Sequence, residues 1–190
     1  MDVYEAIAAR RSVRQFRREP IDQAVLERMF RAASLAPSAR NEQPWQFHVA
    51  AGNTRLELGR ILSQTTVYLG EYVEELGPDE YDRAVAWFST LGDAPVLAVA
   101  AAPESDDEMT ATNRMLSVGA AIENLLLAAI AEGLGGCPFT FSYWVRTELA
   151  ARLSLPEGWT VACVVALGWP LPEVEITHRA PRPDSIVWLD

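Results

Sequence analysis

The sequence predicts a protein of the α+β class whose residues 1–190 form one domain. Two continuous apolar runs of strand length, residues 95–102 and 159–167, are typical of strands that are buried on both faces. A long apolar helix is predicted between them, within residues 115–140. Other helical stretches flank these elements, and no internal repeat, low-complexity tract or linker divides the chain. We therefore expect three or four strands that are buried between helices.

The helix within residues 115–140 is the element around which we expect the chain to be organised. Residues 125–131 form an unbroken apolar run, so every face of about two helical turns is hydrophobic. The run is far shorter than the roughly 20 apolar residues that span a bilayer, and we expect the helix to be buried on all sides. A Gly-rich turn at residues 133–136 ends it, and residues 137–140 predict a short extended segment.

Helical patterns begin near the N-terminus. Residues 2–9 have acidic side chains in the first turn, and Val3, Tyr4 and Ile7 give the predicted helix an apolar face. Asp22 is placed to cap a second helix, which ends before a proline-rich loop. The first part of the chain therefore predicts two amphipathic helices.

Further helices are predicted after the alternating strand pattern of residues 45–50. Asn53 is placed to cap a helix that continues to about residue 64, and residues 145–153 predict a short helix. Residues 67–91 are helical and acidic, and they contain five prominent aromatic side chains: Tyr68, Tyr72, Tyr81, Trp87 and Phe88. These aromatic residues could line a pocket, although an amphipathic helix that packs its own apolar face is the simpler explanation.

Composition excludes several classes of protein. The formal net charge of −10 argues against nucleic acid or an anionic membrane as a partner. Cys137 and Cys163 have no metal-binding spacing and predict no disulfide framework, and His48 and His178 are isolated. No basic and apolar leader is present, so we expect a protein of the reducing cytoplasm.

The densest basic cluster of this acidic chain lies at residues 10–18, RRSVRQFRR. Arg10 and Arg11 could simply complement the C-terminal end of the first helix, with the other arginines in solvent. The cluster could equally bind an anion, because arginine offers paired donors that match phosphate and Ser12 adds a hydroxyl. The cluster alone leaves both interpretations open.

A second candidate segment is the polar loop at residues 36–45, APSARNEQPW. Pro37 and Pro44 exclude a regular helix or a central strand between them. Such a loop is usually a solvated surface, but this one runs directly into the strand pattern of residues 45–50. Loops that are anchored on rigid elements often carry function.

Five motifs occur in a fixed order along the chain. They are RRSVRQF at 10–16, APSARNEQPW at 36–45, ENLLLAA with GLGGCP at 123–138, LGWP at 167–170, and an Arg-x-Pro tail at 179–181. Each motif is weak by itself, but their combination resembles the FMN-dependent nitroreductase family over almost the whole chain.

This resemblance implies a nitroreductase-like fold with a small, mostly antiparallel central sheet surrounded by helices, in a homodimer with FMN at the interface. The residues that it assigns to the FMN phosphate and ribityl chain are Arg10, Ser12 and Arg14, with Arg11 beside them, and either Arg179 or Arg182 from the tail. The residues that it assigns to flavin contact from the other subunit are Pro37, Ser38, Ala39 and Asn41. Those that it places alongside the isoalloxazine are Pro138, Phe139 and Thr140. It also implies that residues 67–91 cover the pocket.

The function that this resemblance implies is hydride transfer from NADH or NADPH, through FMN, to a flat acceptor such as a nitroaromatic or a quinone. The flavin carries the chemistry in such proteins, so no catalytic side chain and no metal are expected. Three alternatives stay open. The GLGGCP turn is similar to that of the cyclic dipeptide oxidases, which are FMN-dependent dehydrogenases or oxidases; a flavin-consuming dimethylbenzimidazole synthase is more distant; and a protein could sequester flavin without turnover.

Overall fold

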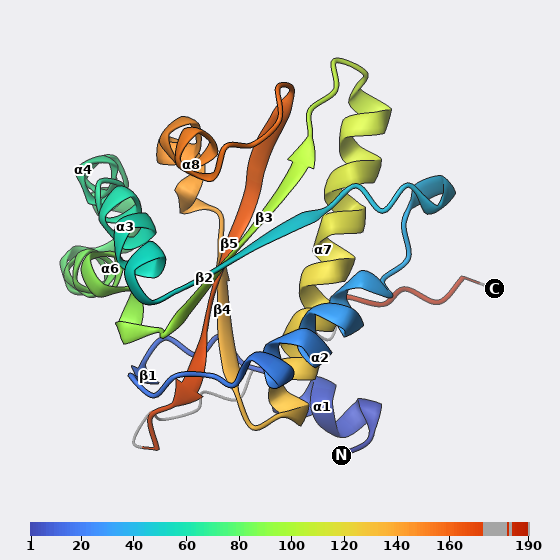
Figure 1. Cartoon of the computed structure of the whole chain (residues 1–190), viewed down its shortest axis with the longest axis horizontal. Coiled ribbons are helices and arrows are strands. Elements are labelled where there is room, and N and C mark those ends of the chain that lie inside the picture. Colours follow the sequence, from blue (N-terminus) through green and yellow to red (C-terminus); the bar gives the residue numbers. More distant parts are fainter. Residues whose placement is uncertain (173–181, 183, 190) are drawn as a thin grey trace.

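The computed structural model describes residues 1–172, 182 and 184–189. In this part of the chain a five-stranded sheet lies between two groups of helices (Figure 1). The strands are β1 (Phe16–Arg17), β2 (Gln46–Ala51), β3 (Val96–Pro103), β4 (Gly135–Phe139) and β5 (Trp159–Pro170). They follow the order β1–β5–β3–β2, β4 also pairs with β5, and all of these pairs are antiparallel. The predicted α+β class and mostly antiparallel sheet are confirmed.

The helices cover both faces of the sheet (Figure 1). One group contains α1 (Val3–Ala9), α2 (Gln23–Ser34) and α7 (Glu108–Ala131). The other contains α3 (Gly52–Ser63), α4 (Thr66–Leu69), α5 (Val73–Leu76), α6 (Pro78–Thr90) and α8 (Arg146–Leu153). Short 3₁₀ turns are η1 (Ala39–Asn41), η2 (Gly70–Tyr72), η3 (Leu91–Asp93) and η4 (Phe141–Val145).

Strand β3 divides the core in two because successive side chains of a strand point to opposite faces. Leu97 and Val99 belong to the core that also contains Leu58 of α3. Val96 and Ala98 belong to the other core, together with residues of α2 and α7. Both faces of β3 are therefore buried, which explains why its sequence is a continuous apolar run rather than an alternating one.

The prediction of three or four strands is wrong, because the structure adds β1. This strand has two residues, Phe16 and Arg17, which pair with Pro170 and Trp169 of β5. Two residues carry no sequence periodicity, so the pairing depends entirely on a partner strand about 150 residues further along the chain. The last strand also continues through Pro170 instead of ending at residue 167.

One of the two predicted helix caps is present and the other is wrong. Asp22 accepts a hydrogen bond from the Ala24 amide at α2. Asp2 and Glu5, predicted as acidic residues at the start of the first helix, also form a capping box at α1. Asn53, in contrast, lies inside the first turn of α3, which begins at Gly52 with no side-chain cap. Strand β2 runs directly into this helix, and Gly52 makes the turn with a φ of 55°.

Residues 67–91 are helical as predicted, but they form two short helices, a 3₁₀ turn and the 13-residue helix α6 rather than one helix. A break occurs at Gly77, whose φ of 76° no helix allows, and Pro78 then starts α6. This arrangement folds the segment into a compact layer beside α3 (Figure 1).

The prediction that the central helix is buried on all sides does not hold for a single chain. Leu125 and Ala129 of α7 are fully buried against the sheet, but Leu116 is 68% exposed and Met115 is 42% exposed. Helix α1 also leaves its predicted apolar face in solvent, and only Ala6 of α1 is buried. Among the described helices, α7 alone has the length and apolar composition of a membrane span, which core helices of soluble proteins share.

Candidate functional site

The basic loop of residues 10–14 is fixed against β4. The Val13 amide donates to the Gly136 carbonyl at 3.0 Å, and Ser12 forms a parallel bridge with Gly136. Gly135 leaves space for the Val13 side chain, since a Cβ there would lie 2.4 Å from Val13 Cγ2. Because side chains alternate in extended backbone, inward packing of Val13 turns Ser12 and Arg14 outward together, and both are exposed.

The main chain at Arg14 is held by the end of α6. Trp87 Nε1 donates to the Arg14 carbonyl at 2.9 Å. The positive charge of Arg14 also acts on the buried thiol of Cys137 in β4: burial raises the pKa of Cys137, and Arg14 partly offsets that rise. The Arg14 guanidinium is therefore near enough to β4 for its charge to act on Cys137.

The two preceding arginines have partners on the helical layer. Arg10 Nε lies 2.9 Å from Oε1 of Glu123 on α7, although the N–H is not aligned as a hydrogen bond. Arg11 Nη1 donates to the carbonyls of Ala8 at 2.6 Å and Arg10 at 2.5 Å, near the C-terminal end of α1. Arg11 thus complements the helix end, as one interpretation of the cluster predicts, whereas Ser12 and Arg14 present polar groups to solvent.

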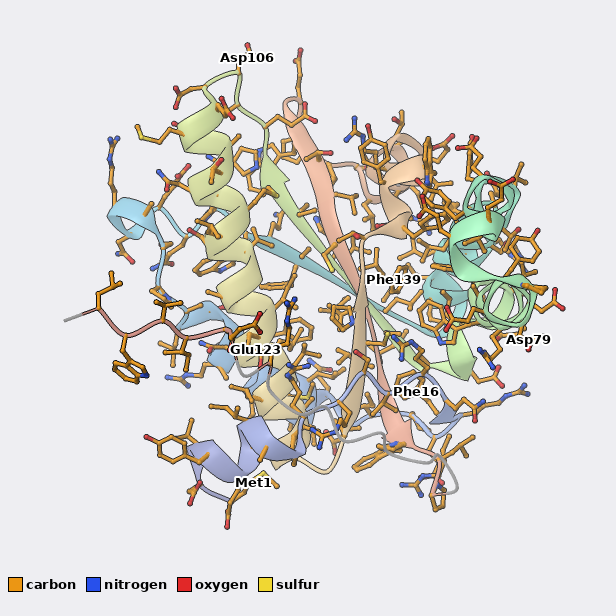
Figure 2. The ribbon with its side chains drawn as sticks, turned by 180° about the vertical axis from the view of Figure 1, so that it is seen from behind. Met1, Phe16, Asp79, Asp106, Glu123 and Phe139 are labelled. Carbon is orange, nitrogen blue, oxygen red and sulfur yellow. The ribbon has the colours of Figure 1, made fainter. Side chains whose placement is uncertain are left out.

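The end of β4 continues the surface on which Arg14 lies. Pro138 is half-buried, Phe139 is buried and Thr140 is exposed. The Phe139 ring meets Trp87 edge to face, with ring centroids 5.1 Å apart. Figure 2 shows Phe139 near one end of β4 and Glu123 on α7, to one side of that strand. The structure thus brings Ser12, Arg14 and residues 138–140 to neighbouring positions.

The loop before β2 is ordered and strained, as expected of an anchored loop. Arg40, Asn41 and Gln43 have φ values of 54°, 57° and 49°, a region that residues other than glycine seldom adopt. The Gln43 amide donates to Ser38 Oγ at 3.0 Å, and Ala39 N donates to Ser117 Oγ of α7 at 3.4 Å. Strained backbone of this kind persists only when its surroundings hold it, and it is common at functional sites.

An ion pair between Arg114 and Glu42 also holds this loop against α7. Arg114 of α7 donates through Nε to Oε1 of Glu42 at 2.8 Å, and its Nη1 donates to the Glu104 carbonyl at 2.8 Å. Pro37 and Asn41 are exposed at the tip, while Ser38 and Ala39 are half-buried. The sequence motif did not identify Arg114, because its role depends on a carboxylate 72 positions away.

The two halves of the predicted site are apart within one chain. Figure 1 shows the η1 loop beyond the end of α2 and beside α7, far from the segment that leads into β1. Ala39 contacts α7 at Ser117 and Arg10 contacts it at Glu123, about 9 Å apart along the helix axis. In the described part of one chain, no hydrogen bond or ion pair joins residues 37–41 to Ser12, Arg14 or residues 138–140.

Of the two tail arginines, Arg179 lies outside the described residues. Arg182 is 84% exposed at its side chain and donates to Asp184 at 3.4 Å. The described tail, residues 184–189, is exposed throughout. The structure therefore supplies no contact between Arg182 and the other predicted site residues.

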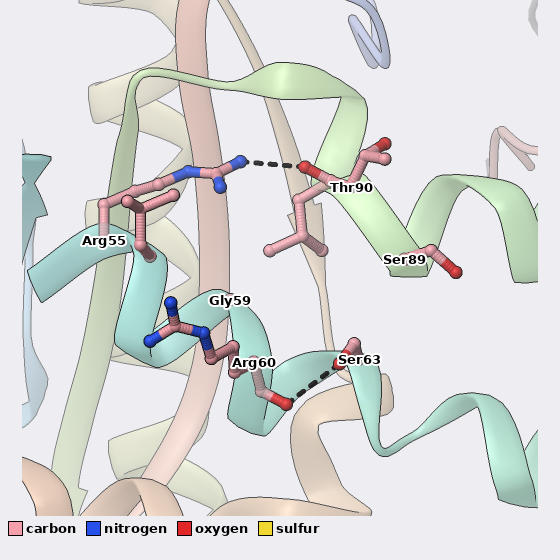
Figure 3. Close-up of a pocket in the computed structure, with 8 residues that line it drawn as sticks. Arg55, Gly59, Arg60, Ser63, Ser89 and Thr90 are labelled. Atoms are coloured by element: carbon pink, nitrogen blue, oxygen red, sulfur yellow. Dashed lines mark hydrogen bonds between the residues drawn. The ribbon is translucent and has the colours of Figure 1, made fainter. Parts of the chain in front are cut away.

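Two hollows of the described surface lie away from the predicted site. A cleft of about 570 Å³ is bordered by Arg18, Asp93 and Arg55, and a smaller one of about 170 Å³ separates α3 from α6 (Figure 3). Arg55 donates to the carbonyls of Ala94 and Thr90 at 2.7 and 2.8 Å, and burial lowers its pKa. Neither hollow is lined by a predicted site residue. Within the described ranges, no cluster of His, Cys, Asp and Glu could hold a metal.

The sequence pattern that defines the nitroreductase family matches residues 7–169, so the chain belongs to this family. The family and fold predicted from the five motifs are thereby confirmed.

Particular relatives differ in the activities that their names state. The 5,6-dimethylbenzimidazole synthase of Rhodospirillum rubrum is 33% identical over 94% of this chain and 85% of that protein. The NADH dehydrogenase of Thermus thermophilus is 27% identical over 99% of this chain and 96% of its own length. A nitroreductase with bound FMN from Bacteroides fragilis superimposes with a TM-score of 0.75, at 22% identity and with full coverage of both chains.

Proposed function

We propose that the protein is an FMN-dependent oxidoreductase, which takes hydride from NADH or NADPH and passes it to a flat acceptor such as a nitroaromatic or a quinone. The observation that carries this proposal is the exposed pair of Ser12 and Arg14 on a loop fixed to β4, in a chain of the nitroreductase family. A guanidinium and a hydroxyl suit a terminal phosphate, and the described chain offers no competing carboxylate partner for Arg14.

The residues of this chain then bind and orient the cofactor. Ser12 and Arg14 hold the phosphate, and residues 138–140 lie along the ring system. The Phe139 and Trp87 rings exclude water at the end of β4. FMN, when bound, supplies the hydride chemistry, so the protein needs to provide orientation and electrostatics rather than an acid, a base or a nucleophile.

We also propose that two copies of the chain form each site. Large apolar side chains are exposed on α1, α7 and the tail: Val3, Tyr4, Ile7, Met109, Met115, Leu116, Ile186, Val187, Trp188 and Leu189. Apolar surface of this extent is typical of protein interfaces, and a symmetric dimer is the commonest solution. A second chain would bring its Pro37, Ser38, Ala39 and Asn41 to the flavin. Free, buried Cys137 and Cys163 agree with a cytoplasmic protein.

A second candidate function is synthesis of 5,6-dimethylbenzimidazole with consumption of the flavin. It is favoured by one observation, the 33% identity to the synthase of Rhodospirillum rubrum. The same Ser12 and Arg14 would then bind the flavin as substrate rather than as a permanent cofactor.

The test is anaerobic mixing of the FMN-loaded protein with NADH and, separately, NADPH, followed by a quinone or a nitroaromatic. We expect the yellow flavin absorbance to bleach quickly and then to return when the acceptor is added. Absence of bleaching with both nucleotides would contradict a reductase and favour an oxidase or a flavin-sequestering protein. Conversion of reduced flavin to dimethylbenzimidazole on admission of oxygen would establish the second candidate instead.

A further inference from the structure

The Arg14 carbonyl is enclosed by the turn that follows α6. Trp87 Nε1 donates to this oxygen at 2.9 Å from one side. On another side lies Gly92, where a Cβ would be 1.9 Å from the same oxygen. Gly92 has a φ of 62°, so the close approach uses both properties of glycine: its positive φ and its missing side chain. Helix α6, through Trp87, and η3, through Gly92, therefore both pack closely against the main chain of Arg14.

Trp87 joins three elements at this point. Its ring meets Phe139 of β4 at 5.1 Å and 87°, and Phe88 of its own helix at 4.9 Å and 79°. Trp87 and Val13 both pack against the same hydrophobic core. One side chain of α6 thus touches the strand beside the proposed ring site and the loop that carries the proposed phosphate ligand.

The hydrogen bond from Trp87 acts on the part of the loop that β4 does not hold. Ser12 and the Val13 amide are paired with Gly136, whereas the Arg14 carbonyl accepts from Trp87 and the Gln15 carbonyl accepts from the Leu171 amide at 3.2 Å. Rotation of the backbone at Arg14 would swing a long side chain and carry its guanidinium away from Ser12. The contact with Trp87 opposes this rotation.

We infer that Trp87 is a positioning residue for the phosphate of the flavin: its indole N–H fixes the Arg14 backbone so that the guanidinium and the Ser12 hydroxyl face one anion. The inference rests on the proposed function. It gives α6 a role that differs from covering the pocket, because the helix determines the preference for a phosphorylated flavin.

The test compares FMN with riboflavin, which lacks the phosphate, by fluorescence titration of the flavin-free protein. Trp87→Phe keeps an aromatic ring and removes only the donor. We expect its affinity for FMN to fall about three- to ten-fold, the range for loss of one hydrogen bond, with little change for riboflavin. The ratio of the two affinities should therefore fall.

Trp169→Phe is the matched control. Trp169 Nε1 also donates to a main-chain carbonyl, that of Pro20, at 3.3 Å, but Trp169 belongs to β5, and its arginine neighbour is Arg17, whose guanidinium lies 5.7 Å from the Trp169 ring centroid. This variant should keep the ratio of the wild type. The double variant Arg14→Ala with Trp87→Phe should show the same ratio as Arg14→Ala alone, since a positioning effect needs the side chain that is positioned.

The outcomes separate the two proposals. An equal loss for both flavins in Trp87→Phe, or no loss, would overturn the positioning role and assign Trp87 to packing. If wild type fails to prefer FMN over riboflavin, or Arg14→Ala leaves the preference intact, the proposed phosphate site itself is wrong. If Arg14→Ala removes the preference and Trp87→Phe does not, only the inference about Trp87 is wrong.

Discussion

Individual side chains of the basic cluster differ in role because their backbone neighbours differ. Arg11 turns back to α1, Arg10 turns to Glu123, and Arg14 faces outward. The sequence could indicate an anion-binding segment, since arginine and serine have the right chemistry. It could not rank the arginines, because the alternation of Ser12, Val13 and Arg14 exists only when the loop pairs with β4, more than 120 residues away.

The sequence also gave no signal for the partner of Arg14. Trp87 could be recognised as one aromatic residue among five in a helical segment, but its donor finds a backbone carbonyl, which every residue possesses. A hydrogen bond to a main-chain carbonyl therefore cannot be predicted from the types of the residues involved. Gly92 is similar, because its need for a missing side chain arises from a contact with distant backbone.

The thiol of Cys163 is a residue whose environment has a measurable consequence. It is buried in β5 with Sγ 3.5 Å from the Phe139 carbonyl, and burial raises its pKa to about 12. In an unfolded chain the same thiol has a pKa near 8.5. Between these values the unfolded state binds fewer protons than the folded state, so stability falls as pH rises.

We expect this effect to disappear in Cys163→Ala. The difference in free energy of unfolding between wild type and this variant should be constant below about pH 8 and should fall by up to about 1.4 kcal/mol per pH unit above about pH 9. Urea unfolding at several pH values and one protein concentration measures it. Cys137 is present in both proteins, so the part of its raised pKa that comes from its own burial cancels. A difference that is independent of pH would show that the thiol ionises freely in the folded state.

Among the secondary-structure elements, the strands that are buried on both faces were predictable from the sequence. The helix boundaries that depend on a local turn of the backbone were not. Strands β3 and β5 are buried on both faces, which leaves an apolar run that any reading of the sequence detects. The start of α3 was missed because the strand-to-helix turn uses Gly52 instead of a polar cap. The breaks near Gly70 and Gly77 were missed because the spacing of apolar residues stays helical across them, even though one helix ends and another begins there.

The packing of α3 against the sheet can be tested directly through two of its leucines. Leu58 is fully buried in the core beneath β3, whereas Leu56, two positions earlier, is 49% exposed. We expect Leu58→Ala to lower the free energy of unfolding by about 2–5 kcal/mol, because it loses apolar burial and leaves a cavity. Leu56→Ala makes the same change in composition and should cost clearly less. Chemical denaturation compares them; similar losses would mean that α3 does not pack through Leu58.

At the level of the whole molecule, one chain leaves two features incomplete. The apolar face of α7 around Met115 and Leu116 is exposed, although its sequence is that of a core helix. The loop carrying Asn41 is also held rigidly, yet it lies apart from the basic loop. The family resemblance predicted that the loop would reach the flavin of a second chain. The apolar sequence of the helix predicted its burial, but periodicity describes burial and does not identify the surface that covers the helix.

A mixed dimer tests whether each flavin site is built from two chains. One chain carries Arg14→Ala, and a differently tagged chain carries Asn41→Gly, which removes the side chain but allows the φ of 57° at this position. Each mutant homodimer places one lesion in every site. If Arg14 of one subunit and Asn41 of its partner share a site, the mixed dimer collects both lesions in one site and leaves the other intact, by the symmetry of a two-fold dimer.

Co-expression and sequential purification on the two tags yield the mixed dimer, and FMN titration counts its sites. We expect about one FMN per dimer with the affinity of the wild type, because Arg14 and Asn41 are both intact at one site. If each site is made within one chain, every site of the mixed dimer keeps one lesion, and its binding curve is the average of the two mutant homodimers. A curve of that form would show that residues 37–41 do not reach the flavin of the other subunit.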